Sequence, residues 1–449
     1  MALTGLDIFK KLPKTNCGEC GVPTCMAFAM KLAARQVEIT LCPYVSEEAK
    51  AELSEASAAP IKKITLGTGD NAFKVGEETV MFRHEKTFVN PGVFGIVIDD
   101  SADDATIADK AKKAQAIEFE RIEMKLRPRV VGVKSTSGSA DKFASAVAKA
   151  AENTKLPIVL ISDDPAIIKA GLDKVKDNNP LIYAADSNNY QAMADLAKEA
   201  GVPLAVKGAT LEELADVSEK VTAAGVKDII LAPQNADISE GLKDLVYIRR
   251  AALKQKYKPL GFPTITFPGN GAADPELEMA LAGVHLMKYG GLIMMNDLDP
   301  ARVLPLLVLQ QNIYTDPQKP MQMSEGIYEI GEPKEDSPVL LTTNFSLTYF
   351  IVSGEVESSR VPAWLCVMDV EGLSVLTAWA AGKFVPEKIA QFVNKSGIND
   401  KVKHHNMILP GYVSQISGEL DDELADWKVT VGPREAGDIP HYLKSWSAS

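Results

Sequence analysis

Long apolar runs and clusters of basic residues are both missing from this sequence of 449 residues. No stretch reaches the roughly 18 consecutive apolar residues that identify a transmembrane helix. Acidic residues outnumber basic ones by 60 to 48, which leaves a formal net charge of -12. Nucleic acids are bound by basic surfaces, because their phosphates must be neutralised. The sequence therefore predicts neither a membrane protein nor a nucleic-acid-binding protein.

A secretory leader is also not recognisable. Residues 1–11 lack a long apolar core followed by a cleavage site. We therefore expect a cytoplasmic protein whose cysteines are held reduced, since disulfides are rare in that compartment.

Cysteine is scarce, but four of the five cysteines fall in one short stretch near the start of the chain. They are Cys17, Cys20, Cys25 and Cys42, with the spacing C-x2-C-x4-C-x16-C. A turn rich in glycine and proline lets the first three thiolates converge, and a predicted helix over residues 25–37 leads to the fourth. Four converging thiolates are the ligand set of a cubane iron–sulfur cluster. The pattern predicts a [4Fe-4S] cluster.

Two other readings of the cysteines stay open. A structural zinc site also uses four thiolates, but it usually takes two C-x2-C pairs, and this chain has one. Disulfides are the least favoured, because no leader is recognised. Pro43, directly after the last cysteine, stops the chain as in other iron–sulfur motifs and so favours the cluster.

The chain is predicted to have four parts. Residues 1–58 form the cluster domain, which ends in a second, polar helix over residues 46–58. Residues 59–92 are expected to be a linker that contains a hairpin. Residues 93–325 form a central domain, and residues 326–449 form a last α/β domain.

Short continuous apolar runs alternate with amphipathic stretches of helical length in the central domain, as expected for strands that are buried on both faces. The runs cover residues 93–98, 130–133, 157–161, 180–184, 203–206, 228–232, 263–267 and 291–295. This alternation predicts a closed (β/α)8 TIM barrel. An open doubly wound sheet would give the same local pattern and stays an alternative.

Polar residues follow the predicted barrel strands, where barrel enzymes carry their chemistry. We expect most of them to be helix caps, because none is a cysteine or a histidine. They are Asp99-Asp100, Lys134-Ser135, Asp163-Asp164, Asp186 to Asn189, Lys207, Gln234-Asn235, Gly269-Asn270 and Asn296-Asp297.

The last domain is predicted to be a small parallel sheet of doubly wound, Rossmann-like type. Its strands cover residues 339–343, 363–369, 406–409 and 427–431, with helices between them. Such sheets bind ligands at the carboxyl ends of their strands. No G-x-G-x-x-G follows the first strand and no G-x-x-x-x-G-K occurs, so neither a dinucleotide nor a nucleoside triphosphate is indicated. The fifth cysteine, Cys366, lies among apolar neighbours and is predicted to be inert core.

Three stretches together resemble a known family, the large (gamma) subunits of the corrinoid iron–sulfur protein of the acetyl-CoA (Wood–Ljungdahl) pathway. They are the cysteine motif from Asn16 to Cys42, the run from Leu341 to Phe350, and the run from Ser374 to Lys383. The resemblance covers the whole chain. It implies a methyl carrier, a subunit of a methyltransferase system, and it assigns no catalytic residue.

The resemblance implies two cofactors. A corrinoid lies on the C-terminal sheet, and its cobalt takes a methyl group as Co(I). The [4Fe-4S] cluster is the low-potential donor that returns accidentally formed Co(II) to Co(I). The corrinoid contacts that the resemblance implies are Thr342, Asn344, Ser346, Thr348, Gly372, Leu373, Ser374, Val375, Gly411, Gly432, Arg434, Glu435 and Ala436.

The resemblance also implies partners. A small subunit forms a heterodimer with the chain, a methyltransferase supplies the methyl group from methyltetrahydrofolate, and acetyl-CoA synthase receives it. A ferredoxin-type reductant would feed the cluster. None of the histidines stands in a D-x-H-x-x-G pattern, so we expect no histidine ligand to cobalt. The alternative from another class is a ferredoxin-dependent enzyme with its active site in the central barrel.

Overall fold

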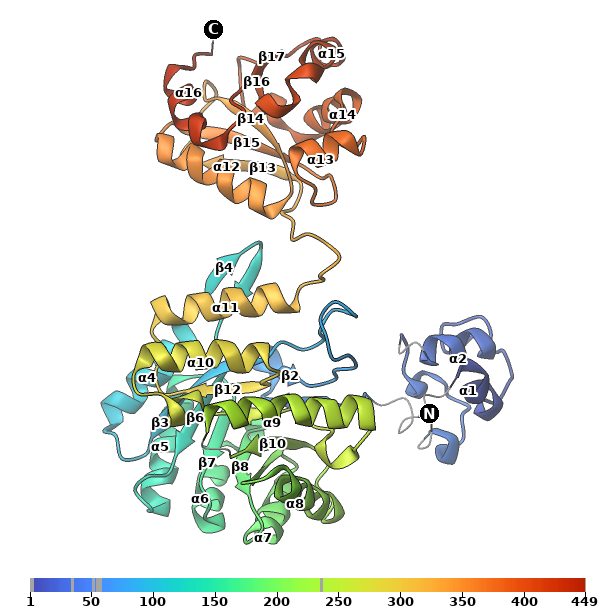
Figure 1. Cartoon of the computed structure of the whole chain (residues 1–449), viewed down its shortest axis with the longest axis vertical. Helices are drawn as coiled ribbons and strands as arrows, with labels where there is room; N and C mark the ends of the chain where they lie inside the picture. Colours follow the sequence, from blue (N-terminus) through green and yellow to red (C-terminus); the bar gives the residue numbers. More distant parts are fainter. Residues whose placement is uncertain (1–3, 34–35, 51–52, 54–58, 235–236, 449) are drawn as a thin grey trace. The chain divides into compact units, whose positions relative to one another are not determined.

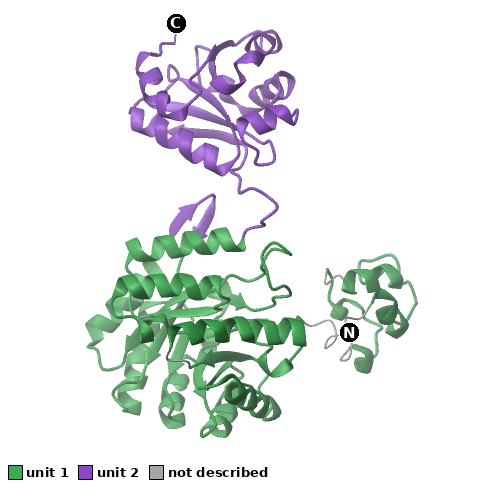
Figure 2. Cartoon of the chain, in the orientation of Figure 1, with its two compact units in different colours: residues 1–118, 127–314 green, residues 119–126, 315–449 purple. Residues whose placement is uncertain are grey.

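The structure, a computed structural model, describes residues 4–33, 36–50, 53, 59–234 and 237–448. The chain divides into two compact units (Figure 2). One comprises residues 1–118 and 127–314, and the other comprises residues 119–126 and 315–449. Among the residues described, no helix is long and apolar enough to cross a membrane.

The N-terminal part of the first unit is a small helical module. Its helices are α1 (Gly5–Lys11) and α2 (Cys25–Ala33), and α1 starts with a capping box between Thr4 and Asp7. Apolar side chains that recur at helical spacing form its core, among them Ile8, Phe28 and Leu32. The predicted helix over 25–37 is therefore found, and it ends at Ala33. Of the predicted helix over 46–58, residues 47–50 and 53 are helical, and residues 51–52 and 54–58 lie outside the described part.

The central region is an eight-stranded sheet whose neighbouring strands all run parallel. Its first strand in the chain pairs with both the second and the last, so the strands follow one another in chain order around the sheet. A bridge between Leu231 and Thr264 joins the two remaining edges. The predicted barrel is confirmed. The strands are β3 (Val93–Asp99), β6 (Val130–Lys134), β7 (Ile158–Ile161), β8 (Leu181–Ala185), β9 (Leu204–Gly208), β10 (Ile229–Pro233), β11 (Ile265–Thr266) and β12 (Leu292–Met295).

Helices follow the barrel strands and surround them (Figure 1). They are α4 (Asp104–Ala116), α5 (Ala140–Asn153), α6 (Pro165–Val175), α7 (Tyr190–Ala200), α8 (Leu211–Ala223), α9 (Ile238–Arg250), α10 (Pro275–Met287) and α11 (Pro300–Tyr314).

The segment predicted as a linker with a hairpin does contain the hairpin, formed by β1 (Ile64–Leu66) and β2 (Phe73–Val75). The two strands place their alternate apolar side chains in the barrel core, where all four are buried: Ile64, Leu66, Phe73 and Val75. Backbone bonds tie its ends to the barrel, from Lys62 N to Gly261 O and from Gly67 N to Asn179 O. From residue 61 onward the segment is therefore attached to the barrel rather than free, because its apolar face needs a partner.

A second hairpin, which was not predicted from the sequence, lies between α4 and β6. Its strands are β4 (Phe119–Arg121) and β5 (Met124–Leu126), and it belongs to the second unit. Glu123 in its turn accepts hydrogen bonds from the Ser324 amide and the Tyr328 hydroxyl at 3.1 and 3.0 Å. The Arg121 guanidinium lies over the Phe350 ring, 5.7 Å from its centre. These contacts explain why eight residues from the barrel sequence group with the C-terminal part.

The second unit contains a five-stranded sheet in the order β13-β15-β14-β16-β17. All pairs are parallel except that of β13 with β15. The strands are β13 (Gly326–Ile330), β14 (Val339–Thr343), β15 (Ala363–Met368), β16 (Asn406–Leu409) and β17 (Lys428–Val431). Since β13 pairs inside this sheet, residues 331–338 are a loop within the unit.

Helices cover both faces of this sheet (Figure 1). On one face, α12 (Ser346–Ser359) and α16 (Ile439–Ser445) share a core with Leu340 and Leu365. On the other face, α13 (Val375–Ala380), α14 (Pro386–Ser396) and α15 (Ser417–Glu423) share a core with Leu341 and Cys366. Cys366 is fully buried, as predicted, and burial raises the pKa of its thiol to about 12.

Candidate functional site

The cysteine loop is shaped by two glycines and one asparagine. Gly18 and Gly21 have φ of +76° and +77°, a conformation that glycine adopts without steric cost, and the Gly21 amide donates to Gly18 O. The Asn16 side-chain oxygen accepts from the Cys25 amide at 2.8 Å, where α2 begins. The loop is therefore turned back onto the helix that carries the third cysteine.

The four cysteines of the motif differ in exposure. Cys25 and Cys42 are buried in the core of the small module, Cys20 packs against that core, and Cys17 is exposed. The Tyr44 hydroxyl, beyond the last cysteine, donates to the Glu19 carboxylate at 2.7 Å. Among the described residues, no group of three or more Cys, His, Asp or Glu side chains is arranged to hold a metal ion. Cys17 and Cys20 lie on the glycine-bearing loop, Cys25 begins α2 and Cys42 follows the short 3-10 helix Ile39–Leu41. Four thiols suit a cluster in their chemistry, and the ligand assignment stays a prediction.

A second candidate site lies in the C-terminal unit, at the carboxyl ends of β14 and β16. The chain order reverses between these two neighbouring strands, and doubly wound sheets open a ligand crevice at that point. A cavity of about 310 Å³ is found there. Eight of the corrinoid contacts predicted from the sequence line this cavity: Thr342, Thr348, Ser374, Val375, Gly432, Arg434, Glu435 and Ala436.

The other predicted contacts do not line this cavity. Some of them instead stabilise neighbouring loops or the core. Asn344 is 2% exposed, and its side chain donates to Asp369 at 2.9 Å and accepts from the Gly372 amide at 3.0 Å. It thereby fixes the loop that follows β15. Ser346 and Leu373 are also outside the cavity lining; Ser346 is buried, and Leu373 packs against the core that α13, α14 and α15 share.

Two glycines allow the loops after β16 and β17 to approach each other closely. A Cβ on Gly411 would lie 2.5 Å from Gly432 O, and a Cβ on Gly432 would lie 2.7 Å from the Ile408 side chain. A larger residue at either position would clash with protein atoms, so the two glycines let these loops pack together.

One buried polar atom in the cavity lining lacks a partner. The Thr342 hydroxyl, at the end of β14, is buried and has no hydrogen-bond partner among the described residues. A buried hydroxyl without a partner costs about 1–3 kcal/mol, so it marks a place where a ligand acceptor or donor would be satisfied. This unpartnered hydroxyl is the feature of the lining that fits an amide-rich ligand such as a corrinoid.

Several cavity residues were not predicted. They come from α12, α13, α16 and the loop after β16: Ile351, Val352, Leu376, Ile439 and Tyr412. The Tyr412 hydroxyl donates to the Glu435 carboxylate, which raises the pKa of the tyrosine. Ile351, Leu376 and Tyr412 are 47%, 43% and 42% exposed, so their apolar surface lies open to solvent beside the cavity. Apolar residues on the outside of helices carry no sequence signal that separates them from core.

The histidines lie away from this cavity. Among the residues described, none lines it. His404 bonds to Ser337 O and to the Asn406 amide, and His405 stacks on Trp427. His285 is on α10 in the other unit, where burial lowers its pKa to about 4.

Some polar residues at the barrel strand ends cap helices, and others bind a loop or line a cavity. Asp164 caps α6 by accepting from the Ala166 amide at 2.8 Å, as expected. Asp100 instead binds the loop after β6, accepting from the Thr136 and Ser137 amides. Lys207 and Gln234 cap nothing and face a cavity in the barrel.

Comparisons with known proteins place the chain in a family. Residues 63–443 match the family described as the CO dehydrogenase/acetyl-CoA synthase delta subunit, and residues 12–44 match a family described as a putative Fe-S cluster. The chain is 43% identical to the corrinoid/iron-sulfur protein large subunit of Moorella thermoacetica, with 100% of each chain covered. It is 37% identical to the acetyl-CoA decarbonylase/synthase complex subunit gamma 2 of Methanosarcina thermophila, with 98% of each covered.

Among solved structures, dihydropteroate synthase from Thermus thermophilus is 14% identical to this chain, with a TM-score of 0.40. That match covers 56% of this chain and 99% of the other, and no functional argument rests on it. The sequence relatives and the two family matches, in contrast, span the cysteine module, the barrel and the C-terminal sheet. This chain belongs to the family of corrinoid iron–sulfur protein large subunits and acetyl-CoA decarbonylase/synthase gamma subunits.

Proposed function

We propose that the chain carries methyl groups on a corrinoid held in the C-terminal cavity. The observation that carries this proposal is the cavity itself, which lies at the strand-order reversal of the sheet and brings together eight of the predicted contacts. We place the corrinoid contacts at these residues, and we extend the classification of the unit to a Rossmann-like corrinoid domain.

The described residues suggest how the chain would bind a corrinoid. The Thr342 hydroxyl, unpaired and buried, would bond to a side-chain amide of the corrin, and Ser374 and Thr348 offer further hydroxyls. Gly432 also lines the cavity and, without a side chain, presents only backbone to a ligand there. When bound, a corrinoid supplies a cobalt that as Co(I) accepts a methyl group, here proposed to come from methyltetrahydrofolate through a methyltransferase and to pass to acetyl-CoA synthase.

The helices that border the cavity expose large apolar side chains. Leu347 on α12 is 57% exposed and Trp379 on α13 is 39% exposed, in addition to Ile351 and Leu376. Apolar surface of this kind beside a ligand cavity favours a partner that covers it. We propose that the small subunit of a heterodimer is that partner.

The cysteine module is proposed to hold a [4Fe-4S] cluster through Cys17, Cys20, Cys25 and Cys42. Cys17 is exposed at the edge of the module, so a cluster there would be within reach of an external reductant of ferredoxin type. When bound, the cluster supplies the low-potential electron that returns Co(II) to Co(I). The match of residues 12–44 to an iron–sulfur family supports a cluster of this general kind.

We further propose that cobalt has no histidine ligand from this chain. The sequence contains no D-x-H-x-x-G, and the described histidines lie outside the cavity. Electron paramagnetic resonance of the Co(II) protein would then show no nitrogen splitting from the chain along the axial direction. A three-line splitting that persists in a corrinoid lacking its own base would contradict this assignment.

The decisive experiment is a visible spectrum of the purified heterodimer with cobalt and iron counts. We expect corrinoid bands with about one cobalt, and about four irons, for each copy of this chain. Thr348→Trp fills the cavity and should reduce cobalt but not iron, whereas Ser358→Trp, on the same helix but outside the cavity, should retain both. Iron without cobalt would instead favour a ferredoxin-dependent enzyme, and normal cobalt in Thr348→Trp would place the corrinoid elsewhere.

A further inference from the structure

A second cavity, of about 560 Å³, opens at the carboxyl ends of the barrel strands. Its volume lies within the usual range of small-molecule sites, roughly 300–1,000 Å³. The carboxyl end of a TIM barrel is also where ligands of this fold bind. Methyl carriage on the C-terminal sheet makes no use of this cavity.

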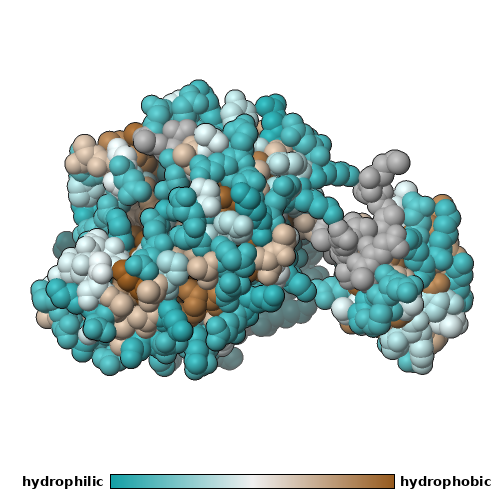
Figure 3. Space-filling model, turned by 90° about the horizontal axis from the view of Figure 1, so that it is seen from below, coloured by the Kyte–Doolittle hydropathy of each residue, from teal (hydrophilic) through white to brown (hydrophobic). Residues whose placement is uncertain are grey.

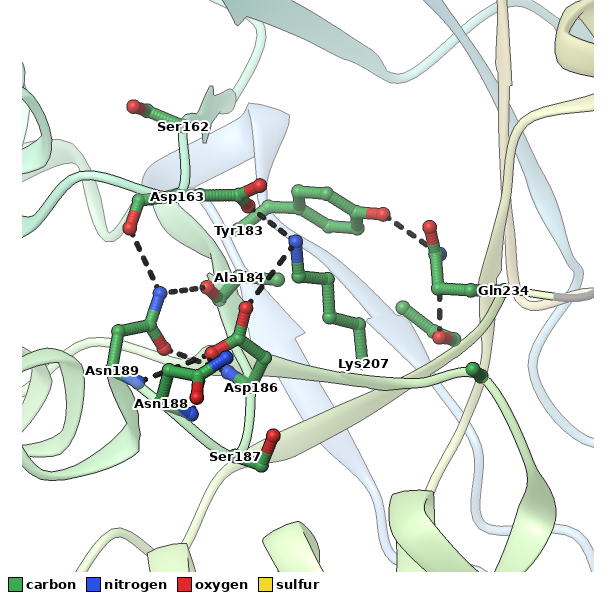
Figure 4. Close-up of polar contacts among 12 residues, drawn as sticks. Ser162, Asp163, Tyr183, Ala184, Asp186, Ser187, Asn188, Asn189, Lys207 and Gln234 are labelled. Carbon is green, nitrogen blue, oxygen red and sulfur yellow. Dashed lines mark hydrogen bonds and ion pairs between the residues drawn. The ribbon is translucent and has the colours of Figure 1, made fainter.

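The cavity holds a lysine that is mostly withdrawn from water. Lys207, on β9, has a side chain 18% exposed, with Nζ 2.6 Å from an Asp163 oxygen and 3.6 Å from an Asp186 oxygen (Figure 4). An ammonium group has three donors, so one remains beyond these two carboxylates. Ion pairs withdrawn from water contribute little net stability, because desolvation offsets their attraction. Lys207 is therefore better explained by a role toward a ligand than by stability.

The carboxylates that flank Lys207 are themselves held in place. The Asp186 carboxylate accepts from the amides of Asn188 and Asn189 at 2.8 and 3.1 Å. The Asn189 amide group donates to Asp163 O at 2.9 Å and to Ala184 O at 3.2 Å (Figure 4). The loops after β7 and β8 are thus joined, and the lysine has a fixed position.

An aromatic and apolar wall lies opposite this polar group. Tyr183 is buried and meets Phe267 edge to face with ring centres 5.0 Å apart, and Val97 and Ile161 also line the cavity. Gln234 Nε2 donates to the Tyr183 hydroxyl at 3.0 Å (Figure 4). That bond orients the Gln234 side chain and leaves its carbonyl oxygen as an acceptor. Asn270 and Asn296 add two further amides to the lining.

Helix capping does not account for this set. Asp164 is a cap, but Lys207, Gln234 and Asn296, at the ends of β9, β10 and β12, and Tyr183, within β8, cap none of the described helices. They combine a flat apolar wall, a donor from an ammonium whose charge is balanced, and a side-chain acceptor. Because two carboxylates already flank the one ammonium group, Lys207 offers no unbalanced positive charge to an anion, and its remaining N–H can act toward a ligand as a hydrogen-bond donor.

We propose that the barrel cavity binds an uncharged planar nitrogen heterocycle that carries a lactam, a ring carbonyl next to a ring N–H. The ring lies against Tyr183 and Phe267. The lactam oxygen accepts from Lys207, and the lactam N–H donates to the carbonyl oxygen of Gln234. Pterins and purine bases share this chemistry.

The test uses the full chain and calorimetric titration with four probes. Pterin and hypoxanthine carry the lactam, caffeine is a planar heterocycle without a ring N–H, and benzoate is a planar anion. We expect pterin or hypoxanthine to bind with Kd below about 1 mM, caffeine about tenfold more weakly, and benzoate not at all. The tighter of the first two probes identifies the source of the natural ligand.

Variants at two glutamines test whether the lactam probes bind in the barrel cavity. Gln234→Ala should weaken lactam binding about tenfold and leave caffeine unchanged, because only the lactam N–H uses that oxygen. Gln191→Ala is the control, since it removes an amide on α7 that bonds to Asp195 outside the cavity. Circular dichroism verifies that each variant is folded, independently of the methyl-carrier proposal. The proposal is overturned if neither lactam probe binds, if benzoate binds as well as they do, or if Gln234→Ala has no effect.

Discussion

The segment between the cysteine module and the first barrel strand is anchored by a buried ion pair, and breaking that pair should release it. Glu78 and Arg249 have side chains 7% and 5% exposed, with Arg249 Nη2 3.2 Å from Glu78 Oε2. Burial raises the pKa of the Glu78 carboxyl, and Arg249 opposes the rise. The Arg249 guanidinium also donates to Val80 O and lies over the rings of Phe88 and Tyr289, 4.7 and 4.3 Å from their centres.

Arg249→Met would leave the Glu78 carboxylate buried without its partner. Loss of one member of a buried ion pair costs about 3–5 kcal/mol. If that cost falls on local opening, amides of residues 77–90 should exchange about 10²- to 10³-fold faster, since about 1.4 kcal/mol is a factor of ten. Adding Glu78→Gln to Arg249→Met removes the unpaired charge and should recover part of the loss.

Hydrogen–deuterium exchange with mass spectrometry of peptides covering residues 77–90 measures this directly. Peptides from α5, on another side of the barrel, serve as the internal control. If Arg249→Met leaves exchange of residues 77–90 within about twofold of the parent protein, the ion pair does not anchor the segment and the reasoning fails.

Three further outcomes are expected. Cys42→Ala should lose most of the iron, whereas Cys366→Ser, at a buried core position, should retain it; iron analysis that finds full iron in Cys42→Ala would contradict the ligand assignment. A chain lacking residues 1–58, once reduced chemically, should accept and donate methyl groups at near-normal initial rates but should not be revived by reduced ferredoxin after oxidation; a large loss in the first turnover by stopped flow would refute this. Burial lowers the pKa of His285 from 6.5 to about 4, so between these values the unfolded chain binds a proton that the folded chain does not, and the free energy of unfolding should fall by roughly 3 kcal/mol as pH drops through this window. Thermal melts of His285→Leu should show a smaller fall over the same window, and an unchanged fall would assign the effect to other groups.

The barrel and the C-terminal sheet could be predicted because their strands are buried on both faces. A run such as Ile158–Ile161 reads as continuous apolar sequence, and its alternation with helices repeats through the chain. The distinction between a closed barrel and an open sheet could not be made from this pattern. It depends on the pairing of β3 with β12, which lie about two hundred residues apart in sequence.

The candidate sites were predictable to different degrees. The cysteine motif is local, so its spacing alone indicates iron–sulfur chemistry. For the C-terminal cavity, the sequence predicted only that a ligand would bind at the carboxyl ends of the strands. Asn344 and Gly411 read as ligand contacts in sequence, yet Asn344 fixes a neighbouring loop and Gly411 allows two loops to pack. The helix residues Ile351 and Leu376 gave no signal, because an exposed apolar residue looks the same as a core residue in sequence.

By itself, the sequence determined the elements that depend on neighbours in the chain: the cysteine loop, the buried strands, the amphipathic helices and the absence of nucleotide motifs. Only the tertiary structure decided which of these elements pack against one another. It placed the β1–β2 hairpin in the barrel core, grouped the β4–β5 hairpin with the C-terminal sheet, and gathered Lys207, Tyr183 and Gln234 around one cavity. The physical reason is that apolar faces and buried polar groups are satisfied by whatever surface lies nearest in space, and sequence patterns record the need for a partner without recording which partner meets it.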